Sequence, residues 1–174
     1  PITVTSAIYR TWACRRLRDV IKWQELWALD SQHGFRPGHR TEDVLMDLTT
    51  RIEETLLDDS KQLYILALDF AKCFDRVPQG IVLQLAKAMG LHDRVGTPLR
   101  AMYKQLRRRF KLPLGVGQEF DVTNGILQGC PLSVTLINAL LSILLRAIED
   151  RVPGVTSLSY ADDATLLSQI GEAA

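Results

Sequence analysis

The feature that most constrains this chain is an apolar run that ends on a carboxylate. Residues 63–68 have the length and composition of a buried β-strand, and Asp69 follows them directly. Asp162 and Asp163 stand together between two further short runs, at the tip of a predicted hairpin. A charge is rare at the end of a buried strand, and neighbouring carboxylates repel each other. A shared set of bound divalent cations would explain all three aspartates.

A purely structural explanation stays open for each aspartate taken alone. An Asp-Asp pair suits a turn, because Asp tolerates turn geometry and caps its own backbone. Asp69 can equally be a strand terminus or a helix cap. The chemical alternative is a pair of Mg²⁺ ions about 3.5–4 Å apart, which clamps the attacking and leaving oxygens of a phosphoryl transfer. Mg²⁺ uses few protein carboxylates, so three on rigid strands are enough.

The rest of the chain predicts an α+β fold. Helices are expected where apolar residues recur at helical spacing and where Pro or Thr stands at the start, and strands are expected where short apolar runs meet turn residues. The strand 63–69 should lie in an antiparallel sheet beside the Asp-Asp hairpin, backed by helices. The expected helices cover 6–28, 41–57, 78–90, a segment from Pro98 and 131–151; the expected strands cover 63–69, 110–114 and 119–123 around Gly115-Val-Gly117, 155–160 and 164–168.

Composition permits a folded, intracellular protein and decides little else. The 174 residues are 47% hydrophobic, with a net charge of +1, so basic residues matter only where they gather, as in 10–22 and 104–111. Three widely spaced cysteines fit a reducing compartment better than a disulfide or zinc framework. No signal peptide is visible, and no uncharged apolar run reaches about 18 residues. We expect a nuclear or cytoplasmic protein without a membrane segment.

Five short motifs stand in order along the chain. They are the opening Pro-Ile-Thr-Val-Thr-Ser-Ala-Ile-Tyr-Arg, Gln32-His-Gly-Phe-Arg-Pro-Gly-His-Arg-Thr, Leu68-Asp-Phe-Ala-Lys-Cys-Phe-Asp-Arg-Val, Gly125-Ile-Leu-Gln-Gly-Cys-Pro-Leu-Ser and Tyr160-Ala-Asp-Asp. Together and in this order they resemble the motifs of reverse transcriptases. The chain is most similar to the enzymes of non-long-terminal-repeat retrotransposons, and also to those of group II introns.

The resemblance implies a polymerase palm with part of the fingers. Residues 1–60 would belong to the fingers and 61–174 to the palm, while the thumb is absent, so the chain alone is expected to be inactive. Asp69, Asp162 and Asp163 would be catalytic and would hold two Mg²⁺ ions, for which Mn²⁺ is an alternative. The Phe70 carbonyl would be a further metal ligand.

The resemblance also assigns substrate contacts. Phe74 would lie under the sugar of the incoming dNTP and exclude a 2′-hydroxyl, with core packing as its alternative role. Gln128 and Gly129 would shape the pocket beside the base. Arg36 would contact the template or the incoming phosphates, with an ordinary surface arginine as the alternative. The run Arg107, Arg108 and Arg109 would bind nucleic acid, with a solvated surface as the alternative.

The implied function is RNA-directed DNA synthesis, with an RNA template, a DNA primer and dNTPs as partners. A non-catalytic RNA-binding relic or a maturase-like module is the main alternative, and the three aspartates argue against it because binding alone does not need them. An RNA-dependent RNA polymerase shares the palm, but Phe74 argues against it. His33 and His39 lack a familiar metal-ligand spacing and are interpreted as polar loop residues. The oligomeric state is left open.

Overall fold

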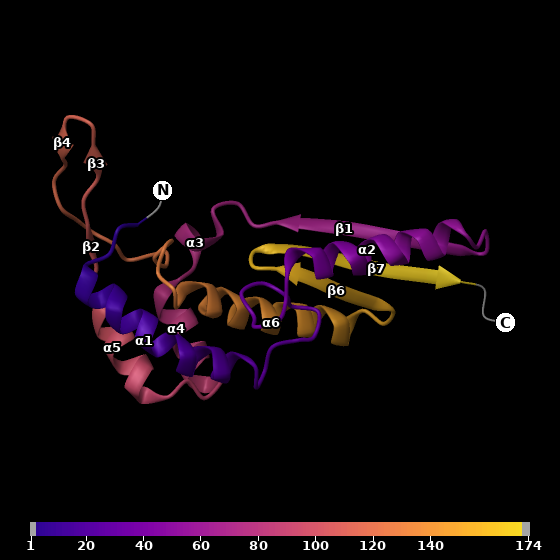
Figure 1. Ribbon diagram of the computed structural model, residues 1–174, viewed down its shortest axis with the longest axis horizontal. Helices are drawn as coiled ribbons and strands as arrows, with labels where there is room; N and C mark the ends of the chain where they lie inside the picture. The colour runs from indigo at the N-terminus through magenta and orange to yellow at the C-terminus, as the bar shows by residue number, and fades with distance from the viewer. Residues whose placement is uncertain (1–2, 172–174) are drawn as a thin grey trace. The chain divides into compact units, whose positions relative to one another are not determined.

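The computed structural model describes residues 3–171, so the opening Pro-Ile of the first motif lies outside the described part (Figure 1). In chain order its elements are α1 (Ala7–Gln24), α2 (Thr41–Leu56), β1 (Lys61–Asp69), α3 (Cys73–Arg76), α4 (Gln79–Ala88), α5 (Asp93–Lys104), β2 (Arg107–Arg108), β3 (Lys111–Leu112), β4 (Gly115–Val116), β5 (Phe120–Asp121), α6 (Ser133–Arg151), β6 (Val155–Tyr160) and β7 (Asp163–Gly171). Helices combined with antiparallel strands confirm the α+β fold class.

The chain forms two compact units, each built from two separate segments. The first unit contains the chain up to Trp23 together with Lys72–Leu136, and the second contains Gln24–Ala71 together with the chain from Ile137 onward. None of the helices within residues 3–171 is long and apolar enough to cross a bilayer.

The second unit is organised around a three-stranded antiparallel sheet with the order β1-β7-β6. β1 and β7 pair over nine positions, from Lys61 opposite Gly171 to Asp69 opposite Asp163. Helix α2 packs against β1 and β6 (Figure 1). Glu149 of α6 accepts hydrogen bonds from the backbone nitrogen and the hydroxyl of Ser157, at 2.9 and 2.6 Å, which fixes α6 to β6.

A buried polar cluster joins the segment after α1 to α6 within the same unit. Gln24, Gln32 and Asn138 are each at most 2% exposed. The Asn138 amide donates to Gln24 Oε1 at 3.1 Å and to the Gly34 carbonyl at 2.8 Å, and the Gln32 amide donates to the Asn138 carbonyl at 3.1 Å. Because buried polar groups are costly when unpaired, these bonds fix the path of residues 24–34.

The first unit packs α1, α4 and α5 with the loop that precedes α6. Trp23 donates its indole N–H to the Met89 carbonyl at 2.8 Å. The Tyr103 hydroxyl, on a side chain that is almost fully buried, accepts the Leu127 N–H at 3.1 Å, and burial raises the pKa of this phenol. The loop therefore has a fixed backbone path before it reaches Gln128.

The predicted elements are confirmed in type, but two of them were placed wrongly. The helix predicted from Pro98 begins at Asp93, because His92 caps it by accepting the Arg94 N–H at 3.0 Å; Pro98 lies inside the helix. The hairpin predicted around Gly115-Val-Gly117 instead turns at residues 113–114, because Lys111 pairs with Val116 and Leu112 with Gly115. On either side of this β3–β4 hairpin, farther from its turn, β2 and β5 pair with each other.

Candidate active site

The sheet of the second unit brings the three predicted aspartates to one end of one ladder. Asp69 and Asp163 are direct cross-strand partners at the last position of the β1–β7 pairing. Direct partners on antiparallel strands lie about 4.5–5.5 Å apart at Cα and point to the same face. Tyr160 is also paired with Asp163, so Ala161 and Asp162 form a two-residue turn beside this pair.

That turn is tight and is held from one side by the loop after α1. Ala161 has a φ of 55°, a left-handed conformation that is unfavourable for residues other than glycine. The backbone of residues 31–33 runs along β6 and exchanges hydrogen bonds with Ser159 at 2.8 Å on both sides. Gly34 then approaches so closely that a Cβ built there would lie 2.1 Å from the Ala161 nitrogen.

The donor set at this end of the sheet fits hard divalent cations. Three carboxylates are available, Asp69 and Asp163 are exposed, and none of the three forms an ion pair with a basic side chain of the described residues. Carboxylate oxygens are the ligands that Mg²⁺ prefers. Their oxygens do not all lie within 4.8 Å of one another, so binding of shared ions would draw the side chains closer together.

The predicted nucleotide-contacting residues lie together in the first unit. Phe74 is half-buried in α3, the short turn that follows β1, and its carbonyl accepts the Ile126 N–H at 2.7 Å. This bond places the loop with Gln128 and Gly129 beside α3. Gly125 has a φ of 80°, and a Cβ there would lie 2.7 Å from the Asp75 carbonyl oxygen, so the close approach requires glycine.

Arg36 is engaged by protein groups of the second unit. Its side chain is 7% exposed and forms a 2.9 Å ion pair with Glu25. Its Nη1 atom donates to the Leu29 and Gln32 carbonyls at 2.6 and 2.8 Å. The hydrogen bonds from Arg36 lower the pKa of Glu25, which keeps the pair charged. The predicted contact of Arg36 with a phosphate would require this arrangement to open.

The three consecutive arginines of the first unit differ in their surroundings. Arg107 and Arg109 form exposed ion pairs with Glu119 at 2.9 and 2.8 Å, and such pairs contribute little to stability. Arg108 is half-buried, and its Nε and Nη2 atoms have no hydrogen-bond partner within the described residues. A buried guanidinium without a partner is costly, and a phosphate oxygen is a strong acceptor for it.

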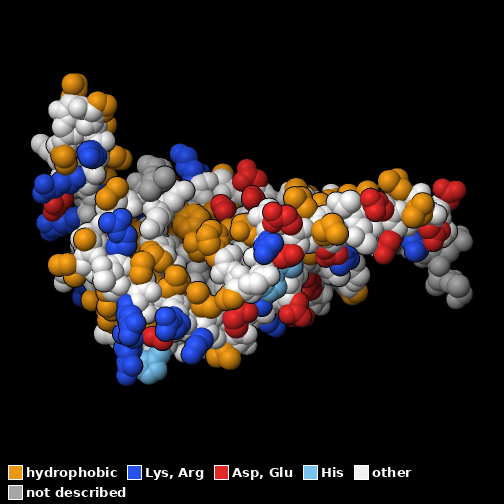
Figure 2. Space-filling model, viewed as in Figure 1, with side chains coloured by type: hydrophobic (Ala, Val, Ile, Leu, Met, Phe, Trp, Pro, Cys, Tyr) orange, Lys and Arg blue, Asp and Glu red, His pale blue; other side chains and the backbone are white. Residues whose placement is uncertain are grey.

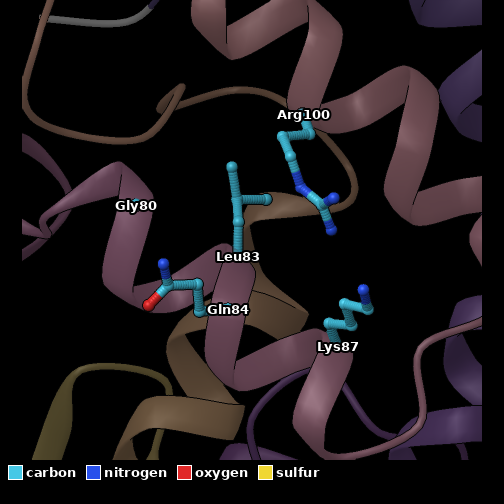
Figure 3. Close-up of a pocket in the computed structure, with 5 residues that line it drawn as sticks. All are labelled: Gly80, Leu83, Gln84, Lys87 and Arg100. Carbon is cyan, nitrogen blue, oxygen red and sulfur yellow. The ribbon is translucent and has the colours of Figure 1, made fainter.

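A pocket of 340 Å³ lies between α4 and α5 in the first unit (Figure 3). It contains two cationic side chains, Lys87 and Arg100, and none of the predicted site residues. The pocket is therefore positively charged, and it is distinct from the predicted nucleotide-contacting residues.

Two groups of residues around the turn were not identified from the sequence. One is the buried cluster of Gln24, Gln32 and Asn138; Gln32 stands in a recognised motif, but neither burial nor its partner on α6 is visible in the sequence. The other is the pair His33 and His39, interpreted as separate polar residues, whose rings meet with Nδ1 atoms 3.0 Å apart. Burial lowers the pKa of His33, and the charge of His39 acts in the same direction.

Sequence comparisons identify the family. The family model described as reverse transcriptase (RNA-dependent DNA polymerase) matches residues 2–174. The Pol polyprotein of the type-1 retrotransposable element R2 from Popillia japonica is 28% identical over 62% of this chain, and that from Nasonia vitripennis is 27% identical over 64%. The chain spans 19% and 12% of the lengths of these two relatives. The predicted resemblance to the non-long-terminal-repeat class is confirmed.

Solved structures show the same fold at much lower identity. Telomerase from Candida tropicalis in complex with a TWJ fragment of telomeric RNA superposes with a TM-score of 0.67 and 16% identity, over 92% of this chain and 29% of that one. Apo telomerase from the same organism, truncated from its C-terminal domain, superposes with a TM-score of 0.61 and 13% identity, over 91% of this chain and 34% of that one. With the family match over nearly every residue, the conclusion is that this chain belongs to the reverse transcriptase (RNA-dependent DNA polymerase) family.

Proposed function

We propose that this chain is the core of an RNA-directed DNA polymerase from a retroelement, and that Asp69, Asp162 and Asp163 bind two Mg²⁺ ions. The main support is the register of the sheet, in which Asp69 lies opposite Asp163 and next to the turn that carries Asp162. Bound ions would stabilise the negative charge that develops when a primer 3′-hydroxyl displaces pyrophosphate from a dNTP.

The chain itself contributes positioning and negative charge. Two strands hold Asp69 and Asp163 in a fixed register, and the turn restricts Asp162. The carbonyl of Phe70, directly after β1, is the additional oxygen ligand in this proposal. No covalent nucleophile is needed, because oriented reactants and fixed charges supply most of the rate enhancement in such reactions.

Substrate recognition is assigned to the first unit and the basic residues. Phe74 would contact the sugar, and Gln128 and Gly129 would line the pocket for the base. Arg108, with its unpaired guanidinium atoms, is the best candidate for a phosphate contact among the predicted arginines. The proposed partners are an RNA template, a DNA primer and dNTPs, with residues 1–60 acting as part of the fingers and 61–174 as the palm.

The decisive experiment is Asp162→Asn in the complete polymerase that contains this chain. The substitution keeps the size of the side chain and removes an anionic metal ligand, so primer extension should be lost. Binding of template RNA should persist, because the arginine contacts with phosphate are unchanged. Both quantities should be measured at one fixed salt concentration.

Asp59→Asn is the matched control. Asp59 is exposed in the turn before β1, at the other end of the ladder, and its substitution makes the same chemical change. Extension should be unaffected in this variant. Normal extension by Asp162→Asn, or equal loss in both variants, would remove the assigned role and favour a binding module without polymerase chemistry.

A further inference from the structure

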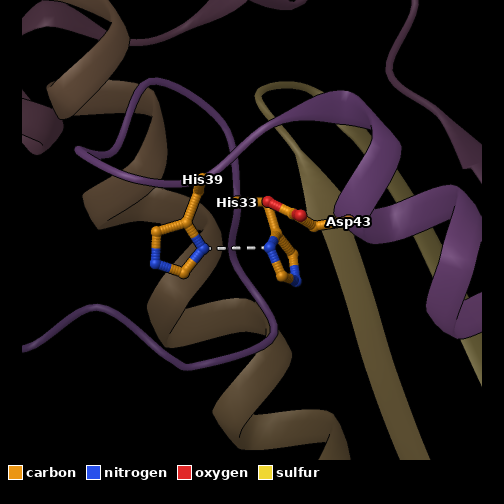
Figure 4. Close-up of side chains that lie close together, drawn as sticks. All are labelled: His33, His39 and Asp43. Atoms are coloured by element: carbon orange, nitrogen blue, oxygen red, sulfur yellow. Dashed lines mark hydrogen bonds between the residues drawn. The ribbon is translucent and has the colours of Figure 1, made fainter.

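The loop that reaches the Ala161-Asp162 turn carries potential metal ligands that gather at one point. One ligand atom each from His33, His39 and Asp43 lies within 4.8 Å of the other two (Figure 4). The two imidazole rings meet edge to face, with centroids 4.9 Å apart and an interplanar angle of 60°. Residues 33 and 39 belong to the loop, and Asp43 belongs to the first turn of α2.

The distance between the two imidazoles suits a chelate. Their Nδ1 atoms are 3.0 Å apart, so at most one of them carries a proton and the other presents a lone pair. In a tetrahedral zinc site with Zn–N bonds of about 2.0–2.1 Å, two nitrogen ligands lie roughly 3.3 Å apart. To become a pair of ligands, the two imidazoles must separate by a few tenths of an ångström and rotate toward a common point. The shared Nδ1 proton must also move, to the Nε2 of its own ring through solvent.

The backbone around the three residues is already fixed. The His33 N–H donates to the Ser159 carbonyl of β6 at 2.8 Å. The Asp43 carboxylate accepts the Arg40 N–H through Oδ2 at 2.6 Å, which leaves Oδ1 for another partner. Because these hydrogen bonds fix the backbone through atoms other than the proposed ligands, binding would not have to order the loop first.

We propose that His33, His39 and Asp43 form a site for a divalent transition-metal ion such as Zn²⁺, separate from the carboxylates at the end of β1 and β7. Two imidazole nitrogens and one carboxylate suit Zn²⁺, whereas Mg²⁺ prefers an all-oxygen shell. Three protein ligands leave a fourth position for water. The ion links the loop to α2 and so stabilises the segment that holds the Ala161-Asp162 turn.

The test is titration of the 174-residue chain, freed of metal with a chelator, with Zn²⁺ and with Co²⁺ as a spectroscopic substitute. One equivalent should bind, raise the unfolding temperature and give the visible absorption of four-coordinate Co²⁺. Thiolate-to-metal charge-transfer bands should be absent, which separates this site from ligation by Cys14, Cys73 or Cys130. Mg²⁺ at the same concentration should not displace the bound Co²⁺ or remove its absorption, because Mg²⁺ prefers an all-oxygen shell.

Two variants remove ligands with little disturbance of the fold. Asp43→Asn keeps an oxygen that can accept the Arg40 N–H, and His39→Asn keeps a polar loop residue. Each should weaken Zn²⁺ binding by at least about tenfold, since loss of supporting residues around a metal alone costs 10–100-fold. Circular dichroism of the metal-free variants establishes that they fold, and His33→Gln replaces any variant that does not.

Three controls have matched chemistry. His92→Asn changes the remaining histidine, which caps α5 and can be replaced by another good cap. Asp47→Asn removes a carboxylate one turn along α2, and Asp69→Asn alters the proposed polymerase site. All three should bind Zn²⁺ like the unsubstituted chain. Failure of the unsubstituted chain to bind, or equal affinity in the ligand variants and controls, overturns the metal site and leaves the polymerase proposal unaffected.

Discussion

Gly34 leaves no room for a side chain beside the turn that carries Asp162. Gly34→Ala would place a methyl group 2.1 Å from the Ala161 nitrogen, where only backbone can give way. We expect a loss of roughly 1–3 kcal/mol in the free energy of unfolding. In the complete polymerase, extension should fall as well, because relief of the clash moves the turn. Denaturant titration measures the first effect and primer extension the second.

Gly80→Ala is the control for this prediction. Gly80 lies in α4, has an ordinary φ, and has nothing within 4 Å of the place that a Cβ would take, so alanine there should be neutral or mildly stabilising. Equal stability of the two variants would show that the close contact at Gly34 is easily relieved.

Phe74 has two possible roles that one substitution separates. If its ring lies under the incoming sugar, Phe74→Val removes atoms that collide with a 2′-hydroxyl, so incorporation of UTP should rise relative to dTTP. A hundredfold change in the ratio of kcat/KM values corresponds to about 2.7 kcal/mol. Core packing predicts instead a cavity that costs about 1–3 kcal/mol, with both substrates affected alike. Single-nucleotide incorporation by the complete polymerase decides between them.

At the scale of elements, the Arg36–Glu25 pair ties the loop to the segment after α1. The hydrogen bonds from Arg36 lower the pKa of Glu25 in the folded chain. The pair therefore contributes stability above the unfolded-state pKa of glutamate, about 4.3, and this contribution is lost as the pH falls through the lowered folded-state pKa.

Glu25→Gln tests this dependence. The variant should be less stable than the unsubstituted chain at neutral pH, and the difference should shrink as the pH falls below about 4. The effect should be small, since the Glu25 side chain is 35% exposed and water screens the pair. Urea titrations at pH 7 and at low pH measure it, and a difference independent of pH would point to lost packing instead.

The type of the longer elements could be predicted from local sequence, whereas several ends and the short elements α3, β2 and β4 could not. Periodicity and turn residues were sufficient for β1, the β6–β7 hairpin and the long helices. Pro98 was a misleading signal, because the cap at His92 starts α5 earlier and the helix tolerates the missing N–H. Likewise, the glycines at 115 and 117 suggested a turn, but strand pairing placed it two residues earlier.

Some residues of the site could likewise be predicted from local sequence, and others could not. Asp69 and the Asp162-Asp163 pair were recognisable because charges interrupt apolar runs and because they stand in motifs that resemble those of reverse transcriptases. The antiparallel sheet that joins their strands was also predicted. The contact between the His33 and His39 side chains could not be predicted, because a loop of five intervening residues has no fixed periodicity. Burial of Arg36 and its pairing with Glu25 also depend on tertiary structure, so motif membership alone suggested a contact with nucleic acid.

At the scale of the whole molecule, much apolar surface is uncovered. No residue of α2 is buried, and exposed apolar side chains include Leu56, Leu57 and Ile65. Figure 2 shows hydrophobic side chains at the tip of the β3–β4 hairpin, where Leu114 is fully exposed. Large exposed apolar side chains in such number are typical of surfaces against which other protein packs.

We therefore expect that these 174 residues alone do not support processive synthesis. The test is extension of an oligo(dT) primer on poly(rA) with Mg²⁺ and dTTP, with light scattering to follow association. Little extension and a tendency to associate are the expected results. Long products from the isolated chain would show that the proposed fingers and palm hold a primer–template unaided.

The register of the nine-position ladder between β1 and β7 affects which mutations a retroelement of this family can tolerate. Side chains alternate between the faces of a strand, so a one-residue slip moves Asp69 to the face opposite Asp163. An in-frame deletion of a single codon within residues 61–67 that shifted the register of β1 would thus separate the acidic pair while leaving every motif intact. The proposed metal site therefore depends on the spacing along this strand as well as on the aspartates themselves.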